Sequence, residues 1–285
     1  MIELSQCRRF FADEIAAVGA IATPRLVDAI AEVPRERFLE PGPWLVRGEA
    51  DVLTGARRTP DADPRHVYHN YSIAIDPARQ LFNGTPGFLA SLIDKLALTP
   101  GARVLHVGAG LGYYSALIGH TVGASGHVMA IEVDRELADR ARGNLSSMPW
   151  VELRAGDGKG PFEDRFDAIL VNAGVTHPQD SWLDALGPGG RLILPLTVAM
   201  PQMGTIGKGV TLLLTKGEDD AWPVNVLGMV AIYSGIGLRD DRLNVALGQA
   251  LRQALFPALR RLRRDVHEPG ARCWLHGSTF CLSAD

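Results

Sequence analysis

The chain has 285 residues, of which 46% are hydrophobic, and a formal net charge of −3 at pH 7. This is enough apolar material for one full α/β core with terminal additions, which we favour, or for two small domains. The balanced charge gives no general electrostatic attraction for nucleic acid or for an acidic membrane surface, so neither is expected as a partner. A charged N-terminus and the lack of an apolar run of about 18 residues predict a soluble, cytoplasmic protein.

The cysteines and histidines do not predict a metal site. Cys7, Cys273 and Cys281 show neither metal-ligand spacing nor a disulfide framework, which fits a reducing compartment. His66 and His69 are close in sequence, but no cysteine or acidic cluster accompanies them at ligand spacing. We therefore expect no bound metal.

Residues 1–65 predict an N-terminal helical addition followed by a loop. Apolar residues recur at helical spacing over Phe10–Val33. Thr23-Pro24 divides this stretch, because threonine suits the N-cap and proline suits the first turn of a second helix. Pro41–Pro64 is rich in proline, glycine and arginine without periodicity, so we expect it to be largely irregular.

Residues 66–236 predict the main domain. After the extended stretch Val67–Asp76, an apolar stripe predicts a helix with Thr85 as its N-cap and Pro86 at its first position. The next segment, Arg103–His120, is an apolar run that ends in alternating glycines and passes directly into a helical pattern. Such a pattern is typical of a strand, a tight turn and a helix N-terminus in one piece.

Strands and helices then alternate, which predicts a parallel sheet covered on both faces. The alternation stops near the end of this domain, where two strands joined by a short polar stretch predict an antiparallel hairpin. Residues 237–285 predict a helical extension, in which a leucine stripe over Asp240–Arg264 is interrupted by Pro257, and a short tail. Arg261, Arg263 and Arg264 form a basic cluster, which is expected to lie in the last turn of this helix. The expected strands of the main domain are Arg103–Val107, His127–Glu132, Val151–Gly158, Phe166–Asn172, Pro188–Pro195, Val210–Thr215 and Val224–Tyr233.

The glycine turn and two strand ends supply hydrogen-bonding groups that can bind a nucleotide-like ligand. Gly108, Gly110 and Gly112 let the backbone turn sharply and approach a ligand closely, and the helix start offers free N–H donors. Glu132 ends the second strand, where a carboxylate can accept hydrogen bonds from ribose hydroxyls. Asp157, followed by Gly158, ends the third strand, where a carboxylate can accept from the exocyclic amine of adenine.

These motifs do not by themselves distinguish a dinucleotide cofactor from the cofactor of a methyltransferase. A dinucleotide fingerprint requires a third glycine where this chain has Tyr113, and dinucleotide dehydrogenases continue with a helical crossover where this chain has a hairpin. A nicotinamide-linked dehydrogenase is therefore the least favoured alternative. The GxGxG pattern followed by an aromatic residue resembles motif I of Rossmann-like methyltransferases.

Five stretches of the sequence form a further pattern. They are Val33–Phe38 (VPRERF), Leu105–Tyr113 (LHVGAGLGY), Gly156–Gly158 (GDG), Phe166–Ile169 (FDAI) and Pro188–Leu192 (PGGRL). Together they resemble the protein-L-isoaspartate O-methyltransferase family over residues 8–235. The resemblance implies the class I S-adenosylmethionine-dependent methyltransferase fold, with five parallel strands closed by an antiparallel hairpin. It also implies S-adenosylmethionine as cofactor, held by Gly108, Gly110, Gly112, Glu132, Asp157 and Gly158.

The residues that would contact the substrate differ from the family pattern. In that family they include a Thr-Ile-Ser-x-Pro stretch, which corresponds here to Phe82–Pro86, so that Gly84 occupies the position of the family serine. A carboxylate acceptor is already ionised at neutral pH and needs a donor that orients it. Thr85 and Asn83 are the candidate donors, although Thr85 also has a complete explanation as a helix cap. A hydroxyl acceptor would need a base, for which His177 after the fourth predicted strand is the candidate.

Two functions from different classes follow from this sequence. The first is an O-methyltransferase that acts on a carboxylate of a protein, a peptide or a small molecule. The second is a cofactor-binding or assembly protein that keeps the S-adenosylmethionine pocket without isoaspartyl repair activity.

Overall fold

The computed structural model describes residues 3–48, 51, 54–199, 205–219, 221–253 and 256–285. It comprises two compact units, one of Met1–Ala102 with Ala109–Ala155, and one of Arg103–Gly108 with Gly156–Asp285. Within the described ranges, no helix is both long enough and apolar enough to cross a membrane.

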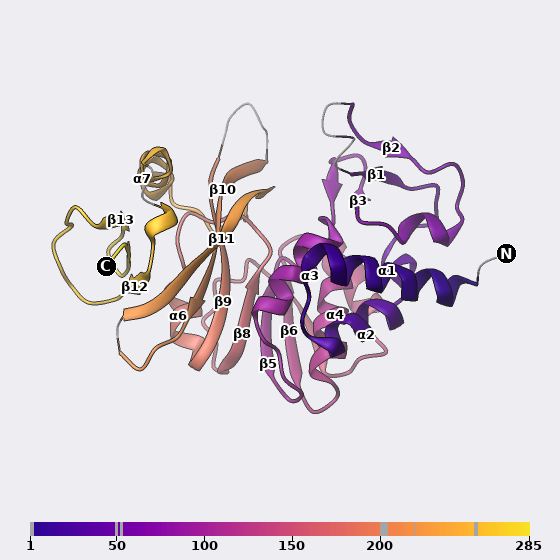
Figure 1. Ribbon diagram of the computed structural model, residues 1–285, viewed down its shortest axis with the longest axis horizontal. Coiled ribbons are helices and arrows are strands. Elements are labelled where there is room, and N and C mark those ends of the chain that lie inside the picture. Colours follow the sequence, from indigo (N-terminus) through magenta and orange to yellow (C-terminus); the bar gives the residue numbers. More distant parts are fainter. Residues whose placement is uncertain (1–2, 49–50, 52–53, 200–204, 220, 254–255) are drawn as a thin grey trace. The chain divides into compact units, whose positions relative to one another are not determined.

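The first unit contains most of the helices and a small antiparallel sheet of order β2-β1-β3-β4 (Figure 1). It also contains the parallel pair of β6 and β7. Its α-helices are α1 (Leu4–Gly19), α2 (Pro24–Glu32), α3 (Pro86–Lys95), α4 (Tyr113–Val122) and α5 (Arg135–Asn144), and its 3₁₀ helices are Arg35–Phe38 and Pro64–Val67. Its strands are β1 (Leu45–Arg47), β2 (Arg57–Arg58), β3 (Ser72–Asp76), β4 (Leu81–Phe82), β6 (His127–Glu132) and β7 (Val151–Ala155).

The two predicted N-terminal helices are confirmed as α1 and α2. Helix α2 begins at Pro24 with Thr23 at its N-cap, as its sequence indicates. The apolar residues of both helices face inward, since Phe11, Ile15 and Ile30 are all fully buried. Burial of an apolar side chain of this size stabilises the fold by roughly 1.5–3 kcal/mol.

The described part of Pro41–Pro64 is largely irregular, as expected, apart from two short strands. Strands β1 and β2 lie within it, and Val46 of β1 pairs with Ile73 of β3. The backbone N–H of Trp44 also donates to the Thr59 hydroxyl at 2.9 Å. These partners are distant in sequence, so local periodicity does not reveal them. Residues 49, 50, 52 and 53 of this stretch lie outside the described residues.

The second unit is built on a mixed sheet. Strand β8 pairs in parallel with both β5 and β9, and β10 pairs antiparallel with both β9 and β11. This arrangement confirms the α/β class and the predicted terminal hairpin, whose strands are longer than expected. The strands are β5 (Arg103–Val107), β8 (Phe166–Val171), β9 (Leu186–Ala199), β10 (Ile206–Thr215), β11 (Ala221–Tyr233), β12 (Arg261–Arg263), β13 (Cys273–His276) and β14 (Cys281–Ser283), and the helices are α6 (Asp180–Ala185), α7 (Asp241–Arg252) and the 3₁₀ helix Phe256–Ala258.

The predicted C-terminal helix is shorter than expected. Helix α7 ends at Arg252, and Leu255 of the leucine stripe lies outside the described residues. Arg261–Arg263 does not form a last helical turn but strand β12, which extends the sheet by pairing with β11. Pro257 has no N–H to continue a helix, and sheet pairing supplies the backbone partners instead. Arg264 forms an ion pair with Asp184 at 2.8 Å.

Arg35 is the structural centre of the first unit. Its side chain is fully buried, and its guanidinium donates to the carbonyl oxygens of Val67, His69 and Tyr71 at 2.7, 3.1 and 2.8 Å. The guanidinium carbon also lies 5.7 Å from the Phe11 ring centroid, within range of a cation–π contact. Arg35 therefore fixes the backbone that leads into β3.

Replacement of Arg35 should destabilise the protein strongly. Arg35→Met keeps much of the side-chain volume but leaves three carbonyl oxygens without their donor, so we expect a loss of about 3 kcal/mol or more in the free energy of unfolding. Denaturant titration followed by circular dichroism measures this loss. Arg37→Met is the control, because Arg37 is exposed in the same 3₁₀ helix and should cost less than about 0.5 kcal/mol. Equal losses in the two variants would contradict the role of Arg35.

Candidate functional site

In the first unit, the turn that contains Gly110 and Gly112 has backbone dihedral angles that favour glycine. Gly110 and Gly112 have φ values of +56° and +92°, in the left-handed region. A Cβ on Gly112 would lie 2.9 Å from Leu145 Cδ1 and one on Gly110 would lie 3.3 Å from Ile75 Cδ1. Gly112 is the N-cap of α4 and supplies no capping side chain.

Glu132 is bonded to this turn. Its side chain is 7% exposed, and its Oε2 accepts a 2.7 Å hydrogen bond from the Gly110 N–H while its Oε1 accepts one of 3.0 Å from the Asp134 N–H. Burial raises the pKa of Glu132, and the two backbone donors oppose that rise. Each carboxylate oxygen has a further lone pair, so the group can still accept from a ribose diol.

Gly108, in the second unit, packs against the end of strand β8. Its φ is +84°, and a Cβ at this position would lie 2.8 Å from the backbone oxygen of Asn172. The Asn172 side chain in turn donates to the Gly108 carbonyl at 3.3 Å. This close approach of two backbones requires glycine. Asn172 was not a sequence candidate, and its position directly after a buried strand is the signal that indicates it.

The Asp157–Gly158 turn also lies in the second unit. Asp157 is exposed and caps the turn, with Oδ1 accepting from the Lys159 N–H at 3.0 Å. Gly158 is buried with a φ of +77°, and a Cβ there would lie 2.7 Å from Val107 Cγ1. Gly237, also at positive φ, is close to the same carboxylate, since its Cβ would lie 3.1 Å from Asp157 Oδ2. No sequence motif singles out Gly237.

The candidate acceptor segment, defined here as Asn83–Thr85, has one fixed and one uncommitted polar side chain. Asn83 Oδ1 accepts from the Ile73 N–H at 2.9 Å, which fixes the amide and leaves its Nδ2 as donor. Thr85 occupies the N-cap position of α3, but its hydroxyl makes no capping hydrogen bond. Gly84 has a φ of +78°, and its Cβ would lie 3.0 Å from Leu89 Cδ2.

Two side chains from elsewhere in the first unit hold the acceptor segment. Asn70 Oδ1 accepts from the Gly87 N–H at 2.9 Å. Asn70 thereby caps α3, which is the role that the sequence predicts for Thr85. The Tyr114 hydroxyl, on α4, donates to the Gly84 carbonyl at 3.2 Å. Helix α4 therefore begins at the glycine turn and also contacts the acceptor segment.

His177 is committed to local contacts in the second unit. Its Nδ1 lies 2.8 Å from the Thr176 hydroxyl and its Nε2 lies 3.2 Å from Gln179 Nε2. Its ring stacks on Phe280 with centroids 6.3 Å apart. Burial lowers the pKa of His177, with nearby acidic groups opposing, so the ring is largely neutral at pH 7.

His106 is buried in a strand, and His66 contacts a nearby carboxylate. Burial lowers the pKa of His106 to about 4, so that it is neutral in its central strand. His66 Nε2 lies 3.0 Å from Asp61 Oδ1. Neither His66 nor His69 belongs to a group of possible metal ligands among the described residues.

The structure thus groups the candidate residues within each unit. Gly110, Gly112 and Glu132 form one hydrogen-bonded group in the first unit, and Tyr114 links the helix of that group to Asn83–Thr85. In the second unit, Gly108 lies against Asn172, and the Asp157–Gly158 turn lies against Gly237 and Val107.

Comparisons with known proteins agree with these motifs. The family model of protein-L-isoaspartate(D-aspartate) O-methyltransferase matches residues 58–209. The chain is 32% identical over 196 residues to the protein-L-isoaspartate O-methyltransferase of Methanopyrus kandleri, which covers 67% of this chain and 77% of that protein. It is also 32% identical over 206 residues to that of Aeropyrum pernix, with coverages of 70% and 71%.

Solved structures show the same fold. A protein-L-isoaspartate O-methyltransferase superposes with a TM-score of 0.65 at 22% identity, over 86% of this chain and 69% of that chain. A putative protein-L-isoaspartate O-methyltransferase from Plasmodium falciparum, in complex with S-adenosyl-L-homocysteine, gives a TM-score of 0.60 at 16% identity, over 80% and 97%.

The capping arrangement of α3 predicts losses of stability of different size for two substitutions. Asn70→Ala removes the oxygen that accepts from the Gly87 N–H, so it should lower the free energy of unfolding by about 1 kcal/mol. Thr85→Ala removes a hydroxyl that makes no capping bond and should cost only a few tenths of a kcal/mol. Thermal and denaturant unfolding measure both, and a larger loss for Thr85→Ala would overturn this assignment of the cap.

Proposed function

The chain belongs to the protein-L-isoaspartate O-methyltransferase family, a family of S-adenosylmethionine-dependent methyltransferases, and on that premise we propose that it methylates a carboxylate of a protein or peptide. The observation that carries the proposal lies within the first unit. Helix α4 begins at the glycine turn bonded to Glu132 and, through Tyr114, holds the segment that contains Asn83 and Thr85. One helix thus connects the candidate cofactor residues of the first unit with the candidate acceptor segment.

The cofactor residues are proposed to be Gly108, Gly110, Gly112, Glu132, Asp157 and Gly158. Each meets a requirement of an adenosyl ligand. The glycines have backbones from which a Cβ is excluded, so a ligand can approach their peptide groups closely. The Glu132 carboxylate retains lone pairs for the ribose hydroxyls, and the exposed Asp157 retains Oδ2 for the adenine amine.

S-adenosylmethionine, when bound, supplies a methyl group on a positively charged sulfur. The acceptor oxygen forms its bond to the methyl carbon as the carbon–sulfur bond breaks, which gives a neutral ester and S-adenosylhomocysteine. No proton has to move, because the carboxylate is ionised at neutral pH. The protein therefore has to hold the acceptor oxygen in line and keep water out. His177 is not needed as a base for this acceptor.

The acceptor contacts are proposed to be the Thr85 hydroxyl and the Asn83 Nδ2. The first is uncommitted because Asn70 caps the helix, and the second is oriented by the bond between Asn83 Oδ1 and Ile73. Both donate, which suits a negatively charged acceptor. They take the place of the family serine, whose position here is Gly84. The alternative of a cofactor-binding protein without methyl transfer is not favoured, because the relatives are named as methyltransferases.

The direct test is a transfer assay with paired peptides. The full chain is incubated with methyl-labelled S-adenosylmethionine and a peptide that contains isoaspartate, or the same peptide with normal aspartate. Base-labile label on the isoaspartyl peptide alone establishes repair-type specificity. Label on both peptides, or on another protein carboxylate, would support methyl transfer but show that the acceptor is not isoaspartate alone. Cofactor binding with no transfer to any peptide or protein carboxylate would contradict the proposal.

The cofactor assignment predicts a loss of affinity in Glu132→Gln. Glutamine keeps an oxygen for the Gly110 N–H but loses the charge that strengthens hydrogen bonds from the ribose. Affinity for S-adenosylmethionine, measured by calorimetry, should fall roughly 10- to 100-fold. Glu136→Gln is the matched control, since Glu136 is an exposed carboxylate in the first turn of α5. An unchanged affinity in Glu132→Gln would remove Glu132 from the site.

The acceptor assignment predicts a loss of transfer in Thr85→Val with little change in cofactor binding. A hydrogen bond to a charged group is worth about 1.5–3 kcal/mol, so kcat/KM for the peptide should fall roughly 10- to 100-fold. Thr85→Ser should retain activity. Thr23→Val is the control, because Thr23 also precedes a helical proline and makes no side-chain capping bond. If Thr85→Val is as active as the wild type, the acceptor is oriented by other groups.

A further inference from the structure

The C-terminal extension contains a cluster of two histidines and two cysteines. His267, Cys273, His276 and Cys281 each offer a ligand atom, and these atoms all lie within 4.8 Å of one another. His267 lies in the loop after β12, Cys273 and His276 begin and end β13, and Cys281 begins β14. His276 and Cys281 are direct cross-strand partners, so the hairpin itself places them side by side.

We propose that these four side chains bind a structural zinc ion. Zinc prefers a tetrahedral set of thiolate and imidazole ligands, in which neighbouring ligand atoms are roughly 3.3–3.8 Å apart. Cys273 Sγ and His267 Nε2 are already 3.7 Å apart. The remaining separations, at most 4.8 Å, close by small rotations of side chains around one ion.

The charge of the cluster suits a divalent ion. Two thiolates and two neutral imidazoles balance the two positive charges of zinc, so the unit carries no net charge. Soft thiolate with imidazole selects zinc over magnesium or calcium, which prefer oxygen ligands.

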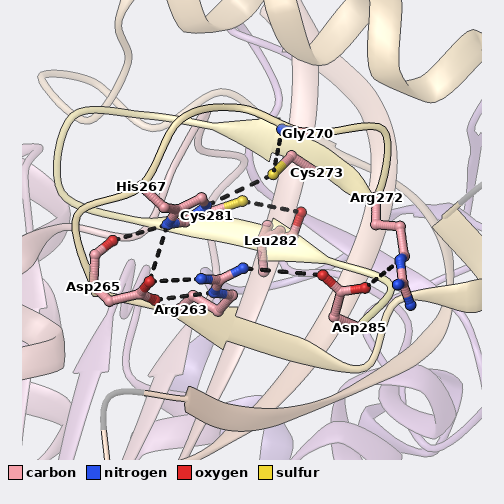
Figure 2. A network of polar contacts seen from close by, with 9 residues as sticks. All are labelled: Arg263, Asp265, His267, Gly270, Arg272, Cys273, Cys281, Leu282 and Asp285. Atoms are coloured by element: carbon pink, nitrogen blue, oxygen red, sulfur yellow. Dashed lines mark hydrogen bonds and ion pairs between the residues drawn. The ribbon is translucent and has the colours of Figure 1, made fainter.

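Contacts around His267 hold it in the orientation that metal binding requires. Its Nδ1 lies 3.0 Å from the Asp265 backbone oxygen and 3.3 Å from the Asp265 carboxylate. Arg263 fixes that carboxylate with two hydrogen bonds of 2.9 and 2.6 Å (Figure 2). A histidine that ligates a metal commonly donates its other ring N–H to a carbonyl or carboxylate in this way.

His276 supplies an independent observation. Its Nδ1 is buried and has no hydrogen-bond partner among the described residues. A buried polar nitrogen without a partner costs free energy, which coordination of a metal by this ring would offset. The His267 and His276 rings meet edge to face with centroids 4.9 Å apart.

The site is structural because all four positions of a tetrahedral ion are filled by the protein. Its effect is to join the β12 loop to both strands of the β13–β14 hairpin. Phe280, in the turn of that hairpin, stacks on His177, so the ion fixes a contact made by the loop that follows β8. The proposal does not depend on the methyltransferase reaction.

The first experiment measures metal in the untagged full chain. After extensive dialysis, mass spectrometry of the elements should find about one zinc per chain. Cys273→Ser and Cys281→Ser should each reduce it to less than about a tenth, because a lost thiolate removes both a bond and a charge. Cys7→Ser is the matched control and should retain full zinc, since Cys7 lies on α1. Zinc that is absent from the wild type and not taken up on titration overturns the proposal, as does zinc that all three variants retain.

A second measurement does not depend on the folding of the variants. Metal-free wild-type chain is titrated with cobalt(II), which reports tetrahedral thiolate coordination by its visible and charge-transfer absorption. Saturation at one equivalent and displacement by zinc are expected. If the folded, reduced chain gives no thiolate-to-cobalt band, or if Cys273 and Cys281 resist reduction as a disulfide, the zinc assignment is wrong.

Discussion

The hydrogen bond from the Gly110 N–H to the buried Glu132 carboxylate organises the proposed cofactor residues of the first unit. A buried carboxylate is costly unless donors satisfy it, and here two backbone N–H groups do so. The bond fixes the glycine turn to the end of β6, and the turn then sets where α4 begins. A cluster of Ile75, Leu111 and Leu137 packs beside it and supplies apolar support. The turn is thus held before any ligand arrives, which lowers the ordering cost of binding.

The acceptor segment is held by groups that leave its own donors uncommitted. Asn70 takes over the helix cap, Tyr114 holds the Gly84 carbonyl, and Arg35 fixes the backbone between the 3₁₀ helix Pro64–Val67 and β3. Without Asn70, the Thr85 hydroxyl would be the natural partner of the free N–H groups of α3. A side chain distant in sequence therefore decides whether this hydroxyl serves structure or substrate. This division of roles is the physical basis for assigning Thr85 to the acceptor.

The sequence predicted the features that arise from local patterns. The alternation of strands and helices, the terminal hairpin and the start of α3 at Pro86 follow from periodicity and proline chemistry, and all are confirmed. The cap by Asn70 and the approach of Gly237 to Asp157 could not be predicted, because each depends on residues that only folding places in contact. The same holds for β12, which local propensity assigned to a helix and sheet pairing made a strand.

The expectation of no metal was drawn from the spacing of the cysteines and from the surroundings of His66 and His69 in the sequence. The proposed ligands alternate histidine with cysteine over His267–Cys281, so that a search for paired cysteines passes over them. The spacing becomes informative only when β13 and β14 pair and bring His276 opposite Cys281.

The left-handed backbone at Gly84 limits which side chain this position can carry. A serine introduced there would have to adopt a φ near +78°, and its Cβ would lie 3.0 Å from Leu89 Cδ2. The Leu89 side chain can rotate away, but the positive φ remains, so a hydroxyl at position 84 would be held on a strained backbone. Donors on the neighbouring residues 83 and 85 carry no such strain.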